Sequence, residues 1–368
     1  MGIADFLSLS DVHAWTSPTV NWLLRVNTAT MNLTVRTVVW QLLVGGGAFL
    51  GVIFSLSKLF TPTFNYRGRH VLVTGGSSGI GLAAAIQYAK LGSRVTIVAR
   101  TQKKLDAALK ELQPHCEEQG QVASAISCDT SASLEECQSK LVNDKVGTVD
   151  VLVNCAGTSI AGSFDALPAH HFESMLKTNV LGSVYPTRAL LPAMKEAGRG
   201  GRIVFVASQV AQVAIYGYTA YAASKWALRG LAEALQMEVK PYGIMVSVCY
   251  PPDTDTPGYE AEMLTKPDIT KKLSESGDVF TSEDVAGDIV KYSAKGYFGI
   301  STGFDGWLLK QLHPGMSPCN NLWEVWQGIL FSGLARFISV FYIASWDSSC
   351  RAAAQSEMDA RKAAKKSK

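Results

Sequence analysis

Short apolar runs alternate with stretches of helical periodicity between residues 69 and 306, and this alternation constrains the fold most strongly. Several runs are rich in β-branched residues and lack polar alternation, which is typical of strands that are covered on both faces. A chain that alternates strands and helices in this way forms a parallel sheet with helices on both sides. We expect an α/β, doubly wound parallel sheet of about seven strands, at residues 70–74, 94–99, 122–128, 149–154, 202–207, 244–249 and 299–302.

A glycine-rich loop, Thr-Gly-Gly-Ser-Ser-Gly-Ile-Gly, directly follows the first expected strand. Glycines let the backbone turn tightly and approach a pyrophosphate, and the N-terminus of the next helix attracts the anion. The spacing G-x-x-x-G-x-G differs from the more common G-x-G-x-x-G, but its position between a strand and a helix is specific. The loop predicts a dinucleotide site that includes Thr74, Gly75, Ser77, Ser78, Gly79, Ile80 and Gly81.

The end of the second expected strand indicates which dinucleotide binds. Folds that bind NAD usually place an acidic residue here for the ribose hydroxyls. This chain has Ala99 instead, followed by Arg100, with Lys104 close behind. A guanidinium can hold a 2′-phosphate through two hydrogen bonds, whereas a carboxylate would repel it. We therefore expect Arg100 and Lys104 to favour NADPH over NADH. The alternative is that Arg100 only ends the strand in solvent.

Tyr221 and Lys225 are separated by one helical turn, and Ser208 precedes them by thirteen residues. Residues i and i+4 share one helix face, so the phenol and the ammonium can converge on one point. A nearby cation favours the phenolate and makes a tyrosine a usable acid or base near neutral pH. The alternative is an ordinary amphipathic helix, because Tyr-x-x-x-Lys alone is a common pattern.

Further motifs follow in order: Asn154-Cys-Ala-Gly157, Lys177-Thr-Asn179, Ser208 and the Tyr221–Lys225 pair. With the glycine loop they resemble those of the short-chain dehydrogenase/reductases over residues 67–306, although Cys155 replaces an asparagine of that pattern. The resemblance implies a Rossmann-type fold and reduction of a ketone by NADPH. It implies that the catalytic residues are Asn179, Ser208, Tyr221 and Lys225. It also implies cofactor contacts from Asp129, Asn154, Ala156, Gly157, Tyr221, Lys225, Pro251, Thr254 and Thr256.

The resemblance also implies a role for each catalytic residue. A hydride passes from the nicotinamide to the ketone carbon, while Ser208 stabilises the developing alkoxide. Tyr221 donates the proton as a general acid. Lys225 lowers the pKa of Tyr221 and binds the nicotinamide ribose, and Asn179 positions a water that resupplies protons.

The loop Tyr250-Pro-Pro-Asp-Thr-Asp-Thr-Pro-Gly departs from the usual Pro-Gly of this family and resembles a membrane-bound subgroup that reduces a long-chain amino ketone lipid. Such a lipid is the expected substrate. Segments 209–218 and 257–281 would line its entrance, with tail contacts from Val213, Ile215, Tyr259, Met263 and Leu264. The alternatives are a membrane-bound reductase of a steroid, a retinoid or a 3-ketoacyl-CoA, and a catalytically silent, nucleotide-binding membrane scaffold.

Residues 37–57 carry no charge and would reach about 31 Å as a helix, which is enough to span a membrane. Basic residues dominate the C-terminal flank, so the following domain is expected in the cytosol. A second apolar block, 322–346, is interrupted by Glu324 and Arg336; it could re-enter the membrane, lie at its interface or pack in a dimer, and interfacial association is favoured. The expected segments are 1–36 non-cytosolic, 37–57 transmembrane, 67–306 reductase, 307–348 membrane-associated and 349–368 a basic tail.

The remaining features narrow the partners and the compartment. Seven cysteines without C-x-x-C pairs indicate reduced cytosolic thiols, and the histidines have no metal-ligand spacing. A net charge of +3 is too small to indicate nucleic-acid binding. The ending Lys365-Lys366-Ser367-Lys368 is similar to a dilysine retrieval signal of the endoplasmic reticulum. The family resemblance is compatible with a homo-oligomer through the helices that carry Asn179 and Tyr221.

Overall fold

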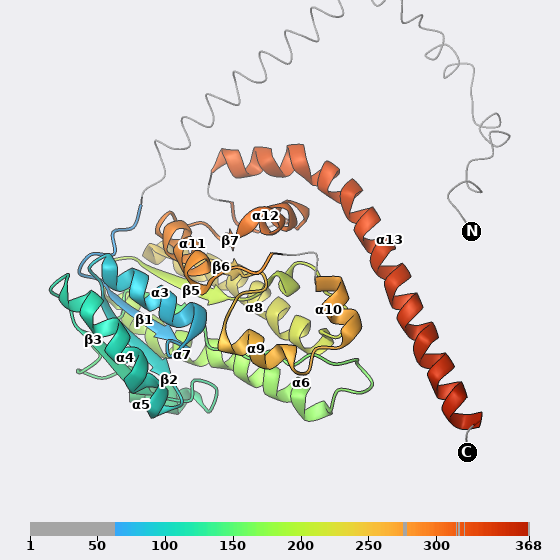
Figure 1. The fold of residues 1–368 in the computed structure, drawn as a ribbon. Coiled ribbons are helices and arrows are strands. Elements are labelled where there is room, and N and C mark those ends of the chain that lie inside the picture. The colour runs from blue at the N-terminus through green and yellow to red at the C-terminus, as the bar shows by residue number, and fades with distance from the viewer. Residues whose placement is uncertain (1–62, 275–277, 314, 316, 320, 367–368) are drawn as a thin grey trace, which may run out of the picture. The chain divides into compact units, whose positions relative to one another are not determined.

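The computed structural model describes residues 63–274, 278–313, 315, 317–319 and 321–366 (Figure 1). A seven-stranded sheet has the order β3-β2-β1-β4-β5-β6-β7, and every neighbouring pair is parallel. The expected doubly wound α/β sheet is therefore confirmed. The strands are β1 (His70–Thr74), β2 (Arg94–Ala99), β3 (Ala123–Ser127), β4 (Val151–Asn154), β5 (Gly201–Val206), β6 (Ile244–Tyr250) and β7 (Gly299–Ser301). The predicted segments 1–36 and 37–57 lie outside the described residues.

The small differences from the expected strand bounds follow from pairing. The pairing of β3 with β2 covers Ala123 to Ser127, so β3 is shorter than predicted at both ends. The pairing of β4 with β1 begins at Val151, two residues later than predicted. Tyr250 pairs with Ser301 and extends β6 by one residue. A strand ends where its partner's ladder ends, and the sequence of one strand does not carry that information.

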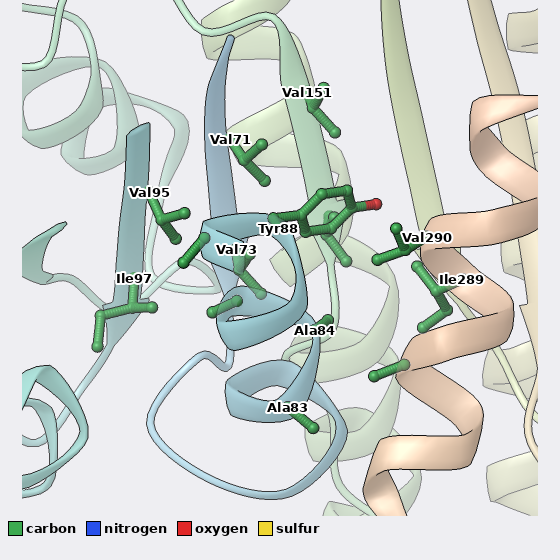
Figure 2. Packing of buried hydrophobic residues seen from close by; sticks show 14 of the residues in the cluster. Val71, Val73, Ala83, Ala84, Tyr88, Val95, Ile97, Val151, Ile289 and Val290 are labelled. Atoms are coloured by element: carbon green, nitrogen blue, oxygen red, sulfur yellow. The ribbon is translucent and has the colours of Figure 1, made fainter. Parts of the chain in front are cut away.

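Helices cover both faces of the sheet, and successive strand residues point to opposite faces. Val71 and Val73 pack with Ala84 and Tyr88 of one helix and Ile289 of another (Figure 2). Leu72, between the two valines, packs in a second cluster on the other face. The first face carries α3 (Gly79–Lys90), α4 (Gln102–Glu117) and α11 (Ser282–Ala294), and the second carries α5 (Leu134–Leu141), α7 (Gly182–Glu196) and α8 (Thr219–Val239). Both faces are covered, which explains the continuous apolar strands.

The strand order reverses at β1, because the chain runs from β1 outward through β2 to β3 and then returns to β4. Thr74 and Asn154 are register partners at the carboxyl ends of β1 and β4. In open α/β sheets, ligands bind in the crevice beyond the strand ends at such a reversal. The fold therefore places the glycine loop and the Asn154 motif at the binding edge.

Shorter elements complete the fold. They are α6 (Ala169–Met175), the π-helical η4 (Leu176–Leu181), η5 (Gln209–Ala211), η6 (Lys240–Tyr242), α9 (Pro257–Met263), α10 (Asp268–Ser274) and α12 (Gly303–Leu312). The expected boundary between residues 306 and 307 falls inside α12.

The second apolar block forms part of one continuous helix, α13 (Leu322–Lys366), which contacts α10 and α12 (Figure 1). Glu324 lies in the first turn of this helix, where an acid is favourable, and its carboxylate pairs with Lys310 of α12 at 2.6 Å. Trp307 and Phe331 also join α12 to α13, with ring centroids 5.3 Å apart. Within the described residues, one helical stretch, Leu322–Ala360, is long enough to cross a membrane and contains an 18-residue window with a mean hydropathy of 1.6. A re-entrant hairpin is therefore not formed, and the boundary between residues 348 and 349 falls inside α13.

Candidate active site

A cavity of about 1390 Å³ lies at the carboxyl edge of the sheet. Residues that follow β1, β2, β4, β5, β6 and β7 all contribute to its wall. The predicted site residues that line it are Gly75, Ser77, Ser78, Gly79, Ile80, Gly81, Arg100, Lys104, Asp129, Ala156, Gly157, Ser208, Tyr221, Lys225, Pro251, Thr254 and Thr256. The topology thus brings together residues that span most of the predicted reductase segment.

The glycine loop has almost no room for side chains. Gly75 adopts a φ of 68°, and a Cβ there would lie 2.8 Å from the backbone of Ala156. A Cβ on Gly81 would collide with the carbonyl oxygen of Gly75. Gly79, with a φ of 53°, would place a Cβ 2.9 Å from the side chain of Thr256. The loop therefore requires glycine for conformation and for close approach, as a backbone cradle for a pyrophosphate does.

Thr74 and Asn154 shape the site from beneath the cavity. The Thr74 Oγ1 accepts hydrogen bonds from the amides of Cys155 at 3.2 Å and Ala156 at 3.3 Å. Asn154 Nδ2 donates to Thr187 at 2.9 Å, and the side chain is buried. The structure therefore gives both residues a supporting position, since neither is part of the cavity wall within the described residues.

Two basic side chains follow β2 and lie where the cavity opens to solvent. Arg100 and Lys104 are exposed, and both contribute to the cavity wall. The carboxylate of Asp129 lies nearby and accepts hydrogen bonds from the Ser131 amide at 3.0 Å and hydroxyl at 2.8 Å. Burial raises the pKa of Asp129, but these hydrogen bonds and the charge of Arg100 outweigh it, so the pKa is lowered overall. The site thus offers exposed cations and a fixed carboxylate.

Asn179 lies in the π-helical turn η4 and is fully buried. Its side-chain amide clamps the backbone of Thr158: Oδ1 accepts from the Thr158 amide at 2.8 Å, and Nδ2 donates to the Thr158 carbonyl at 3.0 Å. Nδ2 also donates to Ser224 of α8 at 2.9 Å. Single π-helical turns within helices often occur at functional sites. In this structure Asn179 joins the segment after β4 to the helix that carries Tyr221.

Lys225 and Ser208 are held by the backbone around β5. The Lys225 ammonium donates to the carbonyl of Val206 at 2.9 Å, and Nζ lies 5.7 Å from the Tyr221 ring centroid. Ser208 caps η5 by accepting from the Val210 amide at 3.2 Å. Gly157 faces the same point, because a Cβ there would lie 3.3 Å from Lys225 Nζ. The predicted serine, tyrosine and lysine are therefore brought to one wall of the cavity.

The pKa of Tyr221 differs from the sequence-based expectation. Burial and then the negative charge of Glu262 raise it above the ordinary value, while a hydrogen bond with Ser208 acts in the opposite direction. The lowering of the Tyr221 pKa predicted from Lys225 does not prevail, because burial is the largest cause and acts in the opposite direction. Burial lowers the pKa of Lys225 itself to about 8. At neutral pH, therefore, both groups are mostly protonated.

The loop after β6 uses its threonines structurally. Thr254 Oγ1 donates to the carbonyl of Pro252 at 2.8 Å, and Thr256 caps α9 by accepting from the Tyr259 amide at 3.0 Å. Both remain part of the cavity wall. Of the five predicted tail contacts, the structure places Val213, Ile215 and Tyr259 on the cavity wall. Met263 and Leu264 do not line the cavity within the described residues, and Leu264 is 88% exposed.

Sequence reasoning missed two parts of the cavity. One is a polar cluster beside Tyr221 formed by Tyr218, Asp253, Glu262 and Lys266; the spacing of Glu262 and Lys266, four residues apart in a helical pattern, was its signal. The other is an apolar wall that α12 and α13 contribute. Its members include Phe304, Leu308, Leu309, Leu312, Ile338, Tyr342, Ile343 and Trp346. The apolar pattern of α13 predicted a membrane contact but not this wall.

The residues fit a nicotinamide dinucleotide. The glycine cradle and the start of α3 suit a pyrophosphate. Gly157 and the nearby Lys225 leave the space and the charge that a nicotinamide ribose requires. The cavity also exceeds the roughly 300–1,000 Å³ of ordinary small-molecule pockets, so a second ligand fits beside the dinucleotide.

Comparisons with known proteins agree with this geometry. The family model described as short chain dehydrogenase matches residues 69–266. A 3-dehydrosphinganine reductase from Danio rerio is 48% identical over 307 residues, which cover 83% of this chain and 92% of that protein. A 3-dehydrosphinganine reductase from Arabidopsis thaliana is 38% identical over 81% of this chain and 89% of its own.

The solved structures include a variant of actinorhodin polyketide ketoreductase with NADPH. It is 30% identical, covers 64% of this chain and 95% of its own, and has a TM-score of 0.57. The sheet, the glycine cradle and these matches lead to one assignment: the chain belongs to the short-chain dehydrogenase family and uses a nicotinamide cofactor.

Proposed function

We propose that this protein reduces 3-ketosphinganine to sphinganine with NADPH, in the synthesis of sphingolipids. The observation that carries the proposal is the cavity itself, which holds Tyr221 and Ser208 at a polar end and an apolar wall from α12 and α13 at another. An amphiphilic ketone matches both ends. Relatives from fish and plant that bear the name 3-dehydrosphinganine reductase support the choice of substrate.

The catalytic roles follow from the placement of the side chains. A bound reduced nicotinamide supplies the hydride. The hydroxyl of Ser208 donates a hydrogen bond to the carbonyl oxygen and stabilises the negative charge that develops there. The phenol of Tyr221 then donates its proton to that oxygen. The raised pKa of Tyr221 keeps the phenol protonated at neutral pH, which is the state that a reduction requires.

Lys225 and Asn179 support the pair formed by Ser208 and Tyr221. The Lys225 ammonium places a positive charge near the ring of Tyr221, 5.7 Å from its centroid, and is positioned for a ribose hydroxyl. Asn179 fixes the Thr158 backbone beside the cavity and meets α8 through Ser224. In our proposal this network holds the water that returns a proton towards Tyr221.

The preference for NADPH rests on charge. Arg100 and Lys104 are exposed on the cavity wall at the end of β2, where NAD-binding folds have an acid. A guanidinium forms strong, paired hydrogen bonds with a phosphate. We therefore propose that these two cations bind the 2′-phosphate.

The membrane assignment rests on the apolar surface of α13. Phe337 and Phe341 are each more than half exposed on this helix. We propose that the protein resides in the membrane of the endoplasmic reticulum with its catalytic domain in the cytosol, where NADPH is available to it. We also propose a homo-oligomer through the side of the domain that carries Leu176 and Leu181 of η4 and Met237 of α8, all exposed apolar residues.

The test is an assay of the purified full-length protein with NADPH and a panel of ketones. The panel contains 3-ketosphinganine, a steroid ketone, a retinal and a 3-ketoacyl-CoA, and products are identified by mass spectrometry. We expect sphinganine as the main product. Turnover of another ketone without turnover of 3-ketosphinganine would refute the proposal, and turnover of none would favour a silent scaffold.

A further inference from the structure

A polar cluster of four side chains lies beside Tyr221. The Tyr218 phenol donates a hydrogen bond to Glu262 of α9, and the rings of Tyr218 and Tyr221 are 5.7 Å apart. Lys266 follows α9, and its Nζ lies 3.4 Å from Asp253 Oδ2 and 3.7 Å from Glu262 Oε1. Tyr218, Asp253 and Glu262 all line the same cavity as Tyr221.

The charges of this cluster do not balance. Two carboxylates, Asp253 and Glu262, share one ammonium, that of Lys266. The side chain of Lys266 is 1% exposed and that of Glu262 is 11% exposed, so water compensates Glu262 poorly, whereas the side chain of Asp253 is 34% exposed and is partly hydrated. A buried carboxylate is costly unless it is paired. Among the residues that the structure describes, the ion pairs of this cluster leave one negative charge unmatched, and a cation in the cavity can match it.

The cavity itself indicates what kind of cation this is. Its apolar wall, formed by α12 and α13 residues such as Leu308 and Tyr342, requires a ligand with a long apolar portion. Its polar end places the uncompensated carboxylate next to the tyrosine that meets the carbonyl. A ligand that satisfies both carries a cationic group near its ketone and a long apolar chain beyond it.

We propose that Glu262, assisted by Asp253, binds the ammonium group that a 2-amino-3-ketone carries beside its carbonyl, and thereby selects amino ketones over plain ketones. This inference rests on the proposed function and names the residue that decides its substrate class. Lys266 and Tyr218 hold the Glu262 carboxylate in place, which makes them positioning residues.

An ammonium group bound to Glu262 would also change the pKa of Tyr221, the proposed general acid. The charge of Glu262 is the second cause, after burial, of the raised pKa of Tyr221. A cation on Glu262 offsets that charge, so the phenol becomes a better proton donor when an amino ketone is bound. A plain ketone leaves the charge in place. The amino group therefore contributes to turnover as well as to binding.

The experiment compares two substrates that differ by the amino group alone, 3-ketosphinganine and 1-hydroxyoctadecan-3-one. Glu262→Gln removes the charge and keeps an acceptor for Tyr218. We expect kcat/KM for 3-ketosphinganine to fall roughly 10- to 100-fold, the effect of losing a hydrogen bond to a charged group. We expect kcat/KM for the plain ketone not to fall, and to rise slightly, because the variant lacks the charge of Glu262 that raises the pKa of Tyr221. The matched control is Glu260→Gln, an exposed acid of the same helix, which should leave both unchanged.

Two further variants guard against a folding defect. Glu262→Asp keeps the charge and should retain discrimination in favour of the amino ketone. Asp253→Asn removes the second carboxylate and should reduce that discrimination in the same direction as Glu262→Gln. Thermal unfolding and NADPH binding, measured for each variant, report the integrity of the fold and the cofactor site.

The outcomes separate the inference from the proposed function. If the wild-type protein reduces 3-ketosphinganine and Glu262→Gln lowers both substrates equally, the carboxylate is structural and the inference fails alone. If Glu262→Gln changes neither substrate, it fails in the same way. If the wild-type protein reduces other ketones but not 3-ketosphinganine, both the proposed function and this inference are refuted.

Discussion

The two halves of the cavity are built in different ways. The nucleotide half is made of backbone: Gly75 and Gly81 leave no room for a Cβ, and Thr74 ties the loop to the segment after β4. The substrate half is made of side chains from α9, α12 and α13, which all belong to the last third of the chain. The first half binds one invariant cofactor, whereas the second must distinguish one lipid. A backbone cradle suits the former task and a side-chain wall the latter.

The largest expected effect lies where the two halves meet. Tyr221→Phe removes the proton donor and should lower kcat roughly 10²- to 10⁴-fold, the usual contribution of a general acid. NADPH binding, measured by fluorescence, should hardly change. Tyr216→Phe is the control, because Tyr216 is 41% exposed and is not among the described residues that line the cavity. Full activity in Tyr221→Phe would remove the tyrosine from the chemistry.

The next effect tests the backbone cradle. Gly75→Ala places a Cβ 2.8 Å from Ala156 at a φ of 68°, so NADPH binding should be lost along with about 1–3 kcal/mol of stability. Gly68→Ala separates strain from contact: Gly68 has a φ of 72°, but a methyl there would meet no described atom within 4 Å. Gly68→Ala should cost stability in thermal unfolding and keep NADPH affinity. Equal loss of affinity in both variants would contradict the cradle.

A smaller effect is expected for the cation that distinguishes the cofactors. Arg100→Ala should raise KM for NADPH roughly tenfold and leave KM for NADH nearly unchanged, because a charge-assisted contact to the 2′-phosphate is lost. Lys103→Ala is the control, since Lys103 is exposed and does not belong to the cavity wall in the described part of the chain. An equal rise in KM for both cofactors would mean that Arg100 contacts a group that NADPH and NADH share, and not the 2′-phosphate.

The smallest effect concerns pH. The pKa of Lys225 is about 8, below its ordinary value, so the ammonium loses its charge as pH rises through that region. Activity should fall up to about tenfold for each unit above it. Stability should move the other way: between about 8 and the ordinary lysine pKa the unfolded chain holds a proton that the folded chain lacks, so this group's contribution rises with pH. An activity loss that coincides with unfolding would contradict this assignment.

The difference between the nucleotide half and the substrate half of the cavity also explains which site residues the sequence could predict. The glycine loop, Asn179, Ser208, Tyr221 and Lys225 are local motifs in a fixed order, and the sheet topology alone brings them together. The cluster around Glu262 could not be predicted in this way, because its members come from separate elements: Tyr218 immediately precedes α8, and Asp253 lies on the loop after β6. The direction of the Tyr221 pKa could not be predicted either, because it depends on the burial of the phenol and on the charge of Glu262, both of which result from tertiary packing.

In the proposed reaction, one cavity brings a reduced nicotinamide and the carbonyl of a long-chain amino ketone into contact. Incubation of the purified protein with 3-ketosphinganine and NADPH that carries deuterium in the transferable position tests it directly. We predict sphinganine that is heavier by one deuterium at the carbon of the former ketone, found by mass spectrometry. Sphinganine without deuterium, or no sphinganine from an active preparation, would contradict this claim.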